Sequence, residues 1–275
     1  MIRERLKPSL SWKDITVLPI SVCIIAKNEE KHIEECCRRL VPYGFEIVLA
    51  DTGSSDRTVE LALKYTDKIY HFEWCGDFAA AKNFAMDKAS HDWILSIEPI
   101  DIDSLTAGMK TYPDASGRIL IRNRFTESGQ TCYEQVRVSR FVNRRYYHFE
   151  GVVHEQIVPR TTSTKYVYQA PITVLHVGYD GSEEEMRAKS LRNISLLKQE
   201  LETTGPDPYI YCQLGQSYRK LHDYEQAFRY FDLGLAMDVD PSLDYVRTMV
   251  ESYGYTLLDL KRNQDALNLL GVYDE

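Results

Sequence analysis

Apolar runs of strand length alternate with segments of helical periodicity through the first hundred residues. The first run, residues 20–26, is nearly continuous and rich in β-branched side chains, which is typical of a strand buried on both faces of a parallel sheet. In residues 29–40, apolar side chains recur three and four positions apart, which predicts a helix. Further strands and helices are expected at 45–50, 58–65, 68–72, 79–89 and 93–97. The alternation favours an open α/β sheet with helices on both faces.

The pattern changes twice after this first part. Residues 117–177 carry β-rich pieces separated by turn residues, such as RILIR, TCYEQVRV, EGVVHEQIV and ITVLHV, which predict a mixed extension of the sheet. Beyond Asp180 the periodicity is helical throughout, beginning with a helix at 183–202 that Gly205-Pro206-Asp207-Pro208 ends.

An internal repeat follows that first helix. Tyr211, Leu214, Gly215, Tyr218, Ala227 and Phe231 fit the large and small residues of a tetratricopeptide repeat, in which two helices interlock. A second copy begins 39 residues later, with extra residues around 238–244. We therefore expect an N-terminal lead at 1–17, an α/β domain at 18–181, and an all-α region at 182–275 with about two repeats and a preceding helix.

Composition excludes several classes of protein. The formal net charge of −8 argues against nucleic acid as the main partner, because binding a polyanion needs a basic face. No stretch approaches the length of apolar sequence that crosses a membrane, and the start of the chain lacks the apolar core of a signal peptide. The six cysteines show no metal-ligand spacing and are interpreted as buried free thiols. The expected location is cytoplasmic.

Polar residues follow the predicted strands at the points where ligands bind in open α/β sheets. They are Lys27, Asn28 and Glu29 after the first strand, 51–56 after the second, and Glu98 with Asp101 after the fourth. The segment 51–56, DTGSSD, could equally be a helix-capping turn, since Asp, Ser and Thr accept hydrogen bonds from free backbone N–H groups.

The chain resembles the family 2 glycosyltransferases, which have the GT-A fold. The matching segments are ISVCIIAKNEEKHIEECC, IVLADTGSSDRTVELA, HFEWCGDFAAAKNFAMDKASHDWILSIE, FEGVVHEQI and LHVGYDG. Within the family, the chain is most similar to the subgroup that joins this domain to tetratricopeptide repeats, which includes the sublancin-type peptide S-glycosyltransferase. The resemblance implies a Rossmann-like GT-A domain that binds a nucleotide-diphosphate sugar.

The resemblance also implies a nucleotide site. Asp51 would accept a hydrogen bond from the uracil ring, and Lys27, Asn28 and Glu29 would border the same pocket. Lys82, where the family usually has arginine, and Asn83 would lie near the base or the diphosphate. The alternative for Lys82 is a solvated helix face.

Glycosyltransferases of this family bind a divalent metal through an Asp-x-Asp motif, because hard oxygen ligands suit Mg²⁺ or Mn²⁺. Glu98 matches the first acid here, Pro99 the middle residue, and Ile100 replaces the metal-binding acid. Asp101, one position on, is the expected substitute, and Glu98 and His154 are the other candidate ligands. If Asp101 does not bind metal, the enzyme works without metal or has lost activity.

The pair His154-Glu155 matches the Gly-x-x-His-Glu pattern of the family. Glu155 would be the general base of an inverting displacement, and His154 would bind the metal or a phosphate. The alternative is a strand that points one of the two inward, where it is merely hydrogen-bonded.

The resulting hypothesis is a glycosyltransferase that moves a sugar from a uridine-linked donor to an acceptor with inversion. The helical repeats would present a surface for a peptide or protein acceptor, and a homo-oligomer is a further option. Two alternatives stay open: a pseudo-glycosyltransferase that only binds nucleotide or acceptor, and a repeat-based protein-binding scaffold.

Overall fold

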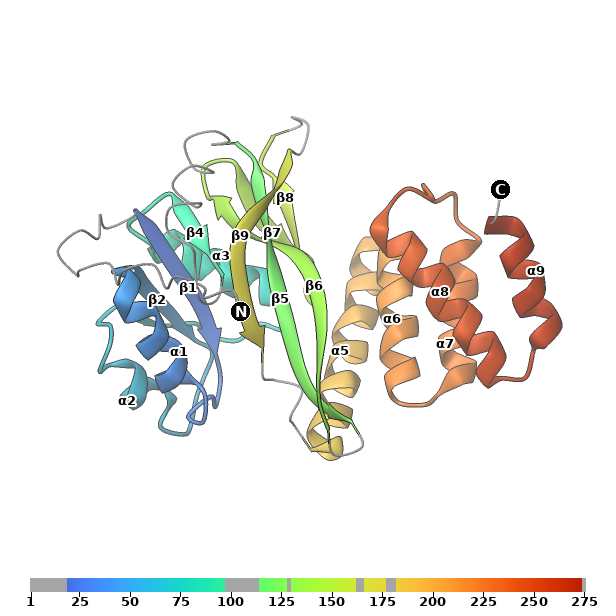
Figure 1. Cartoon of the computed structure of the whole chain (residues 1–275), viewed down its shortest axis with the longest axis horizontal. Coiled ribbons are helices and arrows are strands. Elements are labelled where there is room, and N and C mark those ends of the chain that lie inside the picture. Colours follow the sequence, from blue (N-terminus) through green and yellow to red (C-terminus); the bar gives the residue numbers. More distant parts are fainter. Residues whose placement is uncertain (1–18, 97–113, 128–129, 162–165, 177–181, 274–275) are drawn as a thin grey trace, which may run out of the picture. The chain divides into compact units, whose positions relative to one another are not determined.

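The computed structural model describes residues 19–96, 114–127, 130–161, 166–176 and 182–273 (Figure 1). The predicted N-terminal lead, and Glu98, Pro99, Ile100 and Asp101, lie outside the described residues. The chain forms two compact units. The first is an α/β unit of Met1–Cys75, Ala79–Glu150 and Gln156–Tyr179, and the second is a helical unit of Gly76–Phe78, Gly151–Glu155 and Asp180–Glu275.

The α/β unit is built on one mixed sheet, which has seven strands among the described residues. Its elements are β1 (Ile20–Ala26), α1 (Ile33–Leu40), η1 (Val41–Tyr43), β2 (Glu46–Asp51), α2 (Thr58–Ala62), β3 (Ile69–His71), α3 (Phe78–Lys88), β4 (Trp93–Leu95), β5 (Ser116–Glu127), β6 (Gln130–Asn143) and β9 (Val167–His176). A separate small hairpin consists of β7 (Tyr147–Glu150) and β8 (Gln156–Pro159).

The strand order is β3-β2-β1-β4-β6-β5-β9. Strands β1 to β4 are parallel, as the strand–helix alternation predicts, and β6 then pairs antiparallel with both β4 and β5. The outer strand β9 runs parallel to β5. The parallel half therefore presents the carboxyl ends of β1, β2 and β4 at a single edge of the sheet.

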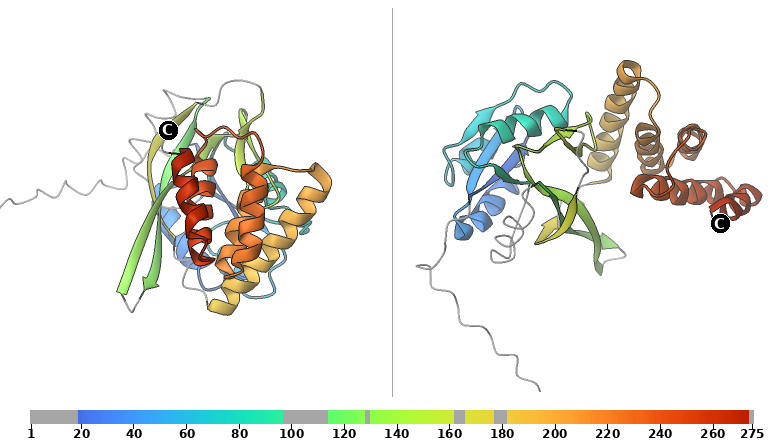
Figure 2. Two further views of the ribbon diagram at one scale, coloured as in Figure 1. Left: turned by 90° about the vertical axis from the view of Figure 1, so that its right-hand side faces the viewer. Right: turned by 90° about the horizontal axis from the view of Figure 1, so that it is seen from above.

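Apolar side chains cover both faces of this sheet. On one face, Ile33 and Leu40 of α1 and Leu61 of α2 pack with alternate residues of the central strands. On the other face, Ala85 and Met86 of α3 pack against the opposite residues of those strands and against β7. Figure 2 shows α1 and α2 on one side of the sheet and α3 on the other. The predicted class, an α/β sheet with helices on both faces followed by an all-α region, is confirmed.

The helical unit contains α5 (Glu183–Thr204), α6 (Pro208–Lys220), α7 (Tyr224–Leu235), α8 (Asp244–Asp259) and α9 (Asn263–Tyr273) (Figure 1). The helices α5, α6 and α7 each begin at a side-chain cap. Ser182 and Glu185 form a reciprocal capping box at the start of α5, and the side chains of Asp207 and Asp223 accept hydrogen bonds from the first N–H groups of α6 and α7. The predicted break at Gly205 is present.

Consecutive helices α6 and α7 interlock closely. A Cβ atom added to Gly215 of α6 would lie 2.4 Å from the ring of Phe231 on α7, so only glycine permits this approach. Residues 236–243 separate α7 from α8, where the repeat pattern predicts extra residues. No helix among the described residues is long and apolar enough to cross a membrane.

Candidate functional site

The loops after β1 and β2 lie side by side because these strands are parallel neighbours. Ala26 pairs with Asp51 at the end of the ladder, and the N–H of Thr52 donates to the carbonyl of Ala26 at 2.9 Å. We call residues 27–30 and 52–57 the strand-end loops. They occupy the edge of the sheet where ligands bind in folds of this class.

Asn28 joins the two strand-end loops. Its N–H donates to Oγ of Ser54 at 3.0 Å, and its Oδ1 accepts from the N–H of Ser55 at 2.8 Å. The backbone of Asn28 has a φ of 56°, a left-handed conformation that asparagine adopts more readily than most residues. Asn28, Lys27 and Glu29 are all exposed.

Glu29 and Glu30 are held by the second loop and not by a helix. The N–H of Glu29 donates to Oγ1 of Thr58 at 2.7 Å, and the N–H of Glu30 donates to Asp56 at 3.1 Å. The helix α1 begins at Ile33, four residues later than the predicted helix. Together with the contacts of Asn28, these bonds fasten the two loops into one surface.

Asp51 is the last residue of β2 and is 8% exposed. Its carboxylate accepts hydrogen bonds from the N–H groups of Gly53 at 3.3 Å and Ser54 at 3.2 Å, and lies 3.8 Å from Nδ1 of His71. A carboxylate offers about four acceptor positions, so it can accept a further hydrogen bond. Asp56, and not Asp51, accepts from the first N–H of α2, at 2.9 Å.

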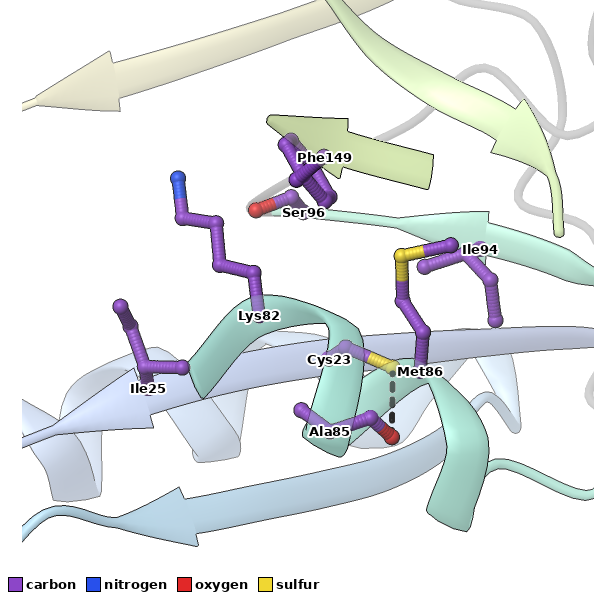
Figure 3. A pocket seen from close by; sticks show the side chains of 8 residues that line it. All are labelled: Cys23, Ile25, Lys82, Ala85, Met86, Ile94, Ser96 and Phe149. Carbon is purple, nitrogen blue, oxygen red and sulfur yellow. Dashed lines mark hydrogen bonds between the residues drawn. The ribbon is translucent and has the colours of Figure 1, made fainter. Parts of the chain in front are cut away.

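Two further predicted residues, Lys82 and Asn83, contact Phe149 of β7. Figure 3 shows Lys82 and Phe149 among the residues that line a pocket. Nζ of Lys82 lies 5.1 Å from the centre of the Phe149 ring, a cation–π distance. Both side chains line a small pocket with Ser96, the residue after β4. Lys82 is half-buried and lines this pocket, and its role in nucleotide binding stays a prediction.

Asn83 contacts the protein backbone. Its Nδ2 donates to the carbonyl of Phe149 at 2.8 Å, and its Oδ1 accepts from the N–H of the same residue at 2.9 Å. The side chain thereby positions Phe149. The sequence predicts a ligand contact for Asn83, and no local signal indicates its pairing with a strand 66 residues away.

Arg140 is a further cation beside the Phe149 ring that the sequence does not single out. Its guanidinium carbon lies 6.0 Å from the centre of the Phe149 ring, and its carbonyl accepts from the N–H of Ser96 at 3.0 Å. Lys82 and Arg140 thus bring two positive charges to the end of β4. In the sequence Arg140 is one of several arginines in a β-rich region, and only the register of β6 against β4 selects it.

His154 and Glu155 lie in a loop, Gly151–Glu155, between β7 and β8. They are therefore not in a strand, which the alternative expected, but Glu155 is buried, as that alternative also expected. Gly151 and His154 have positive φ values of 95° and 56°, which interrupt the extended backbone. Val153 packs with Leu197 of α5 and Leu214 of α6, so the loop belongs to the helical unit.

The helical unit holds the His154 backbone in place. The hydroxyl of Tyr209, in the first turn of α6, donates to the carbonyl of His154 at 2.8 Å. Burial, together with the positive charge of Lys220, lowers the pKa of the His154 imidazole to about 4, although the charge of Glu155 opposes the shift. His154 is therefore neutral near pH 7, the form that can bind a metal ion. Glu155 is 8% exposed.

The predicted metal site cannot be assembled from the described residues. They contain no group of three His, Cys, Asp or Glu side chains that could hold an ion. Of the three expected ligands, Glu98 and Asp101 lie outside the described residues, and His154 belongs to the helical unit. The chemistry of a neutral imidazole fits a metal, but the described residues alone do not form a site for one.

Comparison with known families identifies the first part of the chain. Residues 21–98 match the family model described as "Glycosyl transferase family 2", a span that includes both strand-end loops, Asp51 and Lys82. The chain carries a family 2 glycosyltransferase domain. This glycosyltransferase domain places its candidate residues after β1 and β2 and along α3.

Two relatives are similar to most of this chain. A TPR repeat-containing protein of Synechococcus elongatus is 27% identical over 230 residues, covering 78% of this chain and 56% of the relative. The SPbeta prophage-derived glycosyltransferase SunS of Bacillus subtilis is 27% identical over 221 residues, covering 77% of this chain and 52% of the relative. The chain therefore spans about half the length of these relatives.

Glucosyl-3-phosphoglycerate synthase from Mycobacterium tuberculosis, in complex with Mg²⁺ and uridine diphosphate, aligns with a TM-score of 0.32 and 19% identity. The alignment covers 45% of this chain and 50% of the synthase.

Proposed function

We propose that this chain binds a uridine-diphosphate sugar and transfers the sugar to an acceptor with inversion at the anomeric carbon. The observation that carries the proposal is the surface formed by the strand-end loops, with the nearly buried carboxylate of Asp51 at its base. It lies at the carboxyl edge of a parallel sheet, within the span that matches the glycosyltransferase family.

Each predicted residue has a role in this proposal. Asp51 accepts a hydrogen bond from the uracil N–H, and Lys27, Asn28 and Glu29 border the base. Lys82 places its positive charge beside the diphosphate, where negative charge increases as the sugar leaves. Asn83 acts indirectly, because it positions the Phe149 ring that Lys82 contacts. Glu98 is assigned to the donor site from the sequence alone.

The chemical step is a single displacement. The acceptor heteroatom attacks the anomeric carbon, the bond from that carbon to the diphosphate oxygen breaks, and the acceptor proton passes to a base. We assign the base to Glu155 and propose that neutral His154 contacts the diphosphate or its metal. Both residues belong to a loop fixed by Tyr209 and Val153.

We further propose that Mg²⁺ or Mn²⁺ assists donor binding, with Asp101, Glu98 and His154 as the protein ligands. When bound, the ion supplies positive charge to the diphosphate. The replacement of the family's metal-binding acid by Ile100 favours a second candidate function, a pseudo-glycosyltransferase that binds nucleotide or acceptor without transfer. The cytoplasmic location predicted from the sequence stays a prediction.

The paired helices α6 to α9 support a peptide or protein acceptor, because stacked tetratricopeptide-like pairs present a continuous surface to a partner. The scaffold alternative assigns the whole function to this surface. Nucleotide binding separates the scaffold from the other two functions, since only they require a donor site. Self-association through the same helices is a further option.

The test measures uridine-diphosphate release from several uridine-diphosphate sugars, together with calorimetric binding of uridine diphosphate itself. We expect saturable binding and slow sugar release by hydrolysis, which Glu155→Gln abolishes without weakening nucleotide binding. Binding of uridine diphosphate, with no release of it from any of the donor sugars, would favour the pseudoenzyme. The absence of nucleotide binding would overturn the proposal and favour the scaffold.

A further inference from the structure

The end of β3 places a histidine beside the candidate uracil-binding carboxylate. Strands β2 and β3 are parallel neighbours, and their ladder ends with Asp51 opposite His71. Successive side chains of a strand alternate between the two faces of a sheet, and residues paired in register share a face. The N–H of Phe72 donates to the carbonyl of Asp51 at 2.8 Å, which fastens the end of β3 to the end of β2. The side chains of Asp51 and His71 therefore lie together at the carboxyl edge of the sheet.

The two side chains are close but not hydrogen-bonded to each other. Nδ1 of His71 lies 3.8 Å from Oδ2 of Asp51, which is longer than the upper limit of about 3.2 Å for an N–H···O hydrogen bond. Among the residues that the structure describes, none forms a hydrogen bond with the His71 ring. The negative charge of Asp51 favours the tautomer that carries its proton on Nδ1, because that nitrogen is near the carboxylate. His71 thus presents a hydrogen-bond donor next to an acceptor.

This donor and this acceptor differ in their access to solvent. The side chain of His71 is 71% exposed, whereas that of Asp51 is 11% exposed. The carboxylate accepts from the N–H groups of Gly53 and Ser54. It offers about four acceptor positions, so it can accept from a ligand as well. A ligand that reaches the carboxylate of Asp51 therefore meets the exposed imidazole beside it.

The edge of a uracil ring carries the complementary pair of groups. Its N3–H is a donor, and the neighbouring O4 is an acceptor. Cytosine has the opposite arrangement at the same two places, with an acceptor at N3 and a donor amino group at C4. A carboxylate next to an imidazole N–H therefore complements uracil at both places and opposes cytosine at both. The ribose and the diphosphate limit how far a base can slide along this edge to find a better match.

We propose that His71 donates a hydrogen bond from Nδ1 to O4 of the uracil ring whose N3–H Asp51 accepts, so that the two residues together select uracil over cytosine. This inference rests on the proposed function, because it names a specificity-determining residue of the same nucleotide site. A site built to hydrogen-bond a ligand group rejects an analogue that leaves the site's polar groups unpaired. A histidine that only balanced the charge of Asp51, or only stacked on the base, would favour both nucleotides alike.

The test is calorimetric titration of uridine diphosphate and cytidine diphosphate into the full-length chain and its His71 variants. We expect the wild type to bind uridine diphosphate more tightly than cytidine diphosphate. His71→Ala should weaken binding of uridine diphosphate about tenfold and leave that of cytidine diphosphate unchanged, so the ratio of the two affinities narrows. His71→Gln keeps a side-chain N–H donor and should recover part of the lost affinity for uridine diphosphate.

His91→Ala is the matched control, because His91 precedes β4 at the opposite edge of the sheet, and both affinities should stay as in the wild type. An unchanged ratio of affinities in His71→Ala, or equal losses for the two nucleotides, would overturn the inference while leaving the proposed function in place. Equal binding of the two nucleotides by the wild type would also overturn the inference alone. If the wild type bound neither nucleotide, the proposed function would be rejected together with this role of His71.

Discussion

The side-chain amide of Asn83 forms two hydrogen bonds with the backbone of Phe149, one as donor at 2.8 Å and one as acceptor at 2.9 Å. This pair fastens β7 to α3. The Phe149 ring lies beneath the charge of Lys82, and both side chains line the pocket at the end of β4. The geometry of this pocket therefore depends on Asn83, which need not contact the ligand itself.

Replacing Asn83 with alanine should therefore affect both stability and the pocket. The substitution leaves the N–H and the carbonyl of Phe149 without their partner, a loss of about 1–3 kcal/mol in the free energy of unfolding. Urea unfolding measures it, with Asn268→Ala on the exposed face of α9 as the control that should stay within about 0.5 kcal/mol of wild type. Equal stability of Asn83→Ala and wild type would show that the two hydrogen bonds to Phe149 contribute little to the free energy of unfolding.

Much of the α/β unit is predictable from the sequence because its signals are local. The apolar run at 20–26 is β1 without a change of boundary, and the position of Asp51 at the carboxyl end of the second strand follows from the same kind of pattern. Both signals depend only on neighbouring side chains and on the general rule that ligands bind beyond the carboxyl ends of parallel strands.

The features that sequence analysis misses depend on long-range contacts. The segment EGVVHEQIV alternates like a single strand, yet Val153 packs on α5 and α6, and the chain turns at Gly151 and His154. Similarly, Glu29 and Glu30 fit a helical pattern but bond to the loop after β2. The role of Asn83 depends on a strand that comes 66 residues later.

Two glycines in the helical unit should respond oppositely to alanine. A Cβ on Gly215 would lie 2.4 Å from the Phe231 ring, whereas a Cβ on Gly254 would lie at an ordinary 3.6 Å from Leu269. Gly215→Ala should therefore destabilise the helical unit by about 1–3 kcal/mol, and Gly254→Ala should be neutral or stabilise it by up to about 1 kcal/mol. Thermal melts followed by circular dichroism compare the two. Similar melts for both variants would show that the α6–α7 contact is less close than described.

His154 should make stability depend on pH below neutrality. Its pKa is about 4 in the folded chain, lowered chiefly by burial, against about 6.5 when unfolded, so the unfolded state binds the proton first as pH falls. The low pKa of His154 therefore contributes up to about 3 kcal/mol to the free energy of unfolding. This contribution is fully present above pH 6.5 and is lost between pH 6.5 and 4.

The variant His154→Asn isolates this effect, because asparagine tolerates the left-handed backbone at this position. Denaturant unfolding at pH 7, 5.5 and 4 should show that the free energy of unfolding of the variant rises relative to that of the wild type as pH falls. A constant difference between the two proteins across this range would mean that His154 does not titrate as described.

Metal dependence tests the assignment of Asp101. We expect Mn²⁺ to tighten uridine-diphosphate binding by the wild type, chelation to reverse the gain, and Asp101→Asn to remove it. Ile100→Asp should bring a small gain or a loss, because a second carboxylate crowds an occupied site. If binding by the wild type is indifferent to Mn²⁺ while Ile100→Asp creates a strong dependence, the natural site works without metal.

The central claim is that Asp51, at the base of the strand-end loops, recognises the uracil ring. Calorimetric titration of uridine diphosphate into wild type and Asp51→Ala tests it most directly, with Ser54→Ala as a control that removes a loop contact to Asn28 but keeps the carboxylate. We predict that Asp51→Ala weakens binding by about 1–3 kcal/mol and that Ser54→Ala has a clearly smaller effect. Unchanged affinity in a folded Asp51→Ala protein, or an equal loss in Ser54→Ala, would contradict the account.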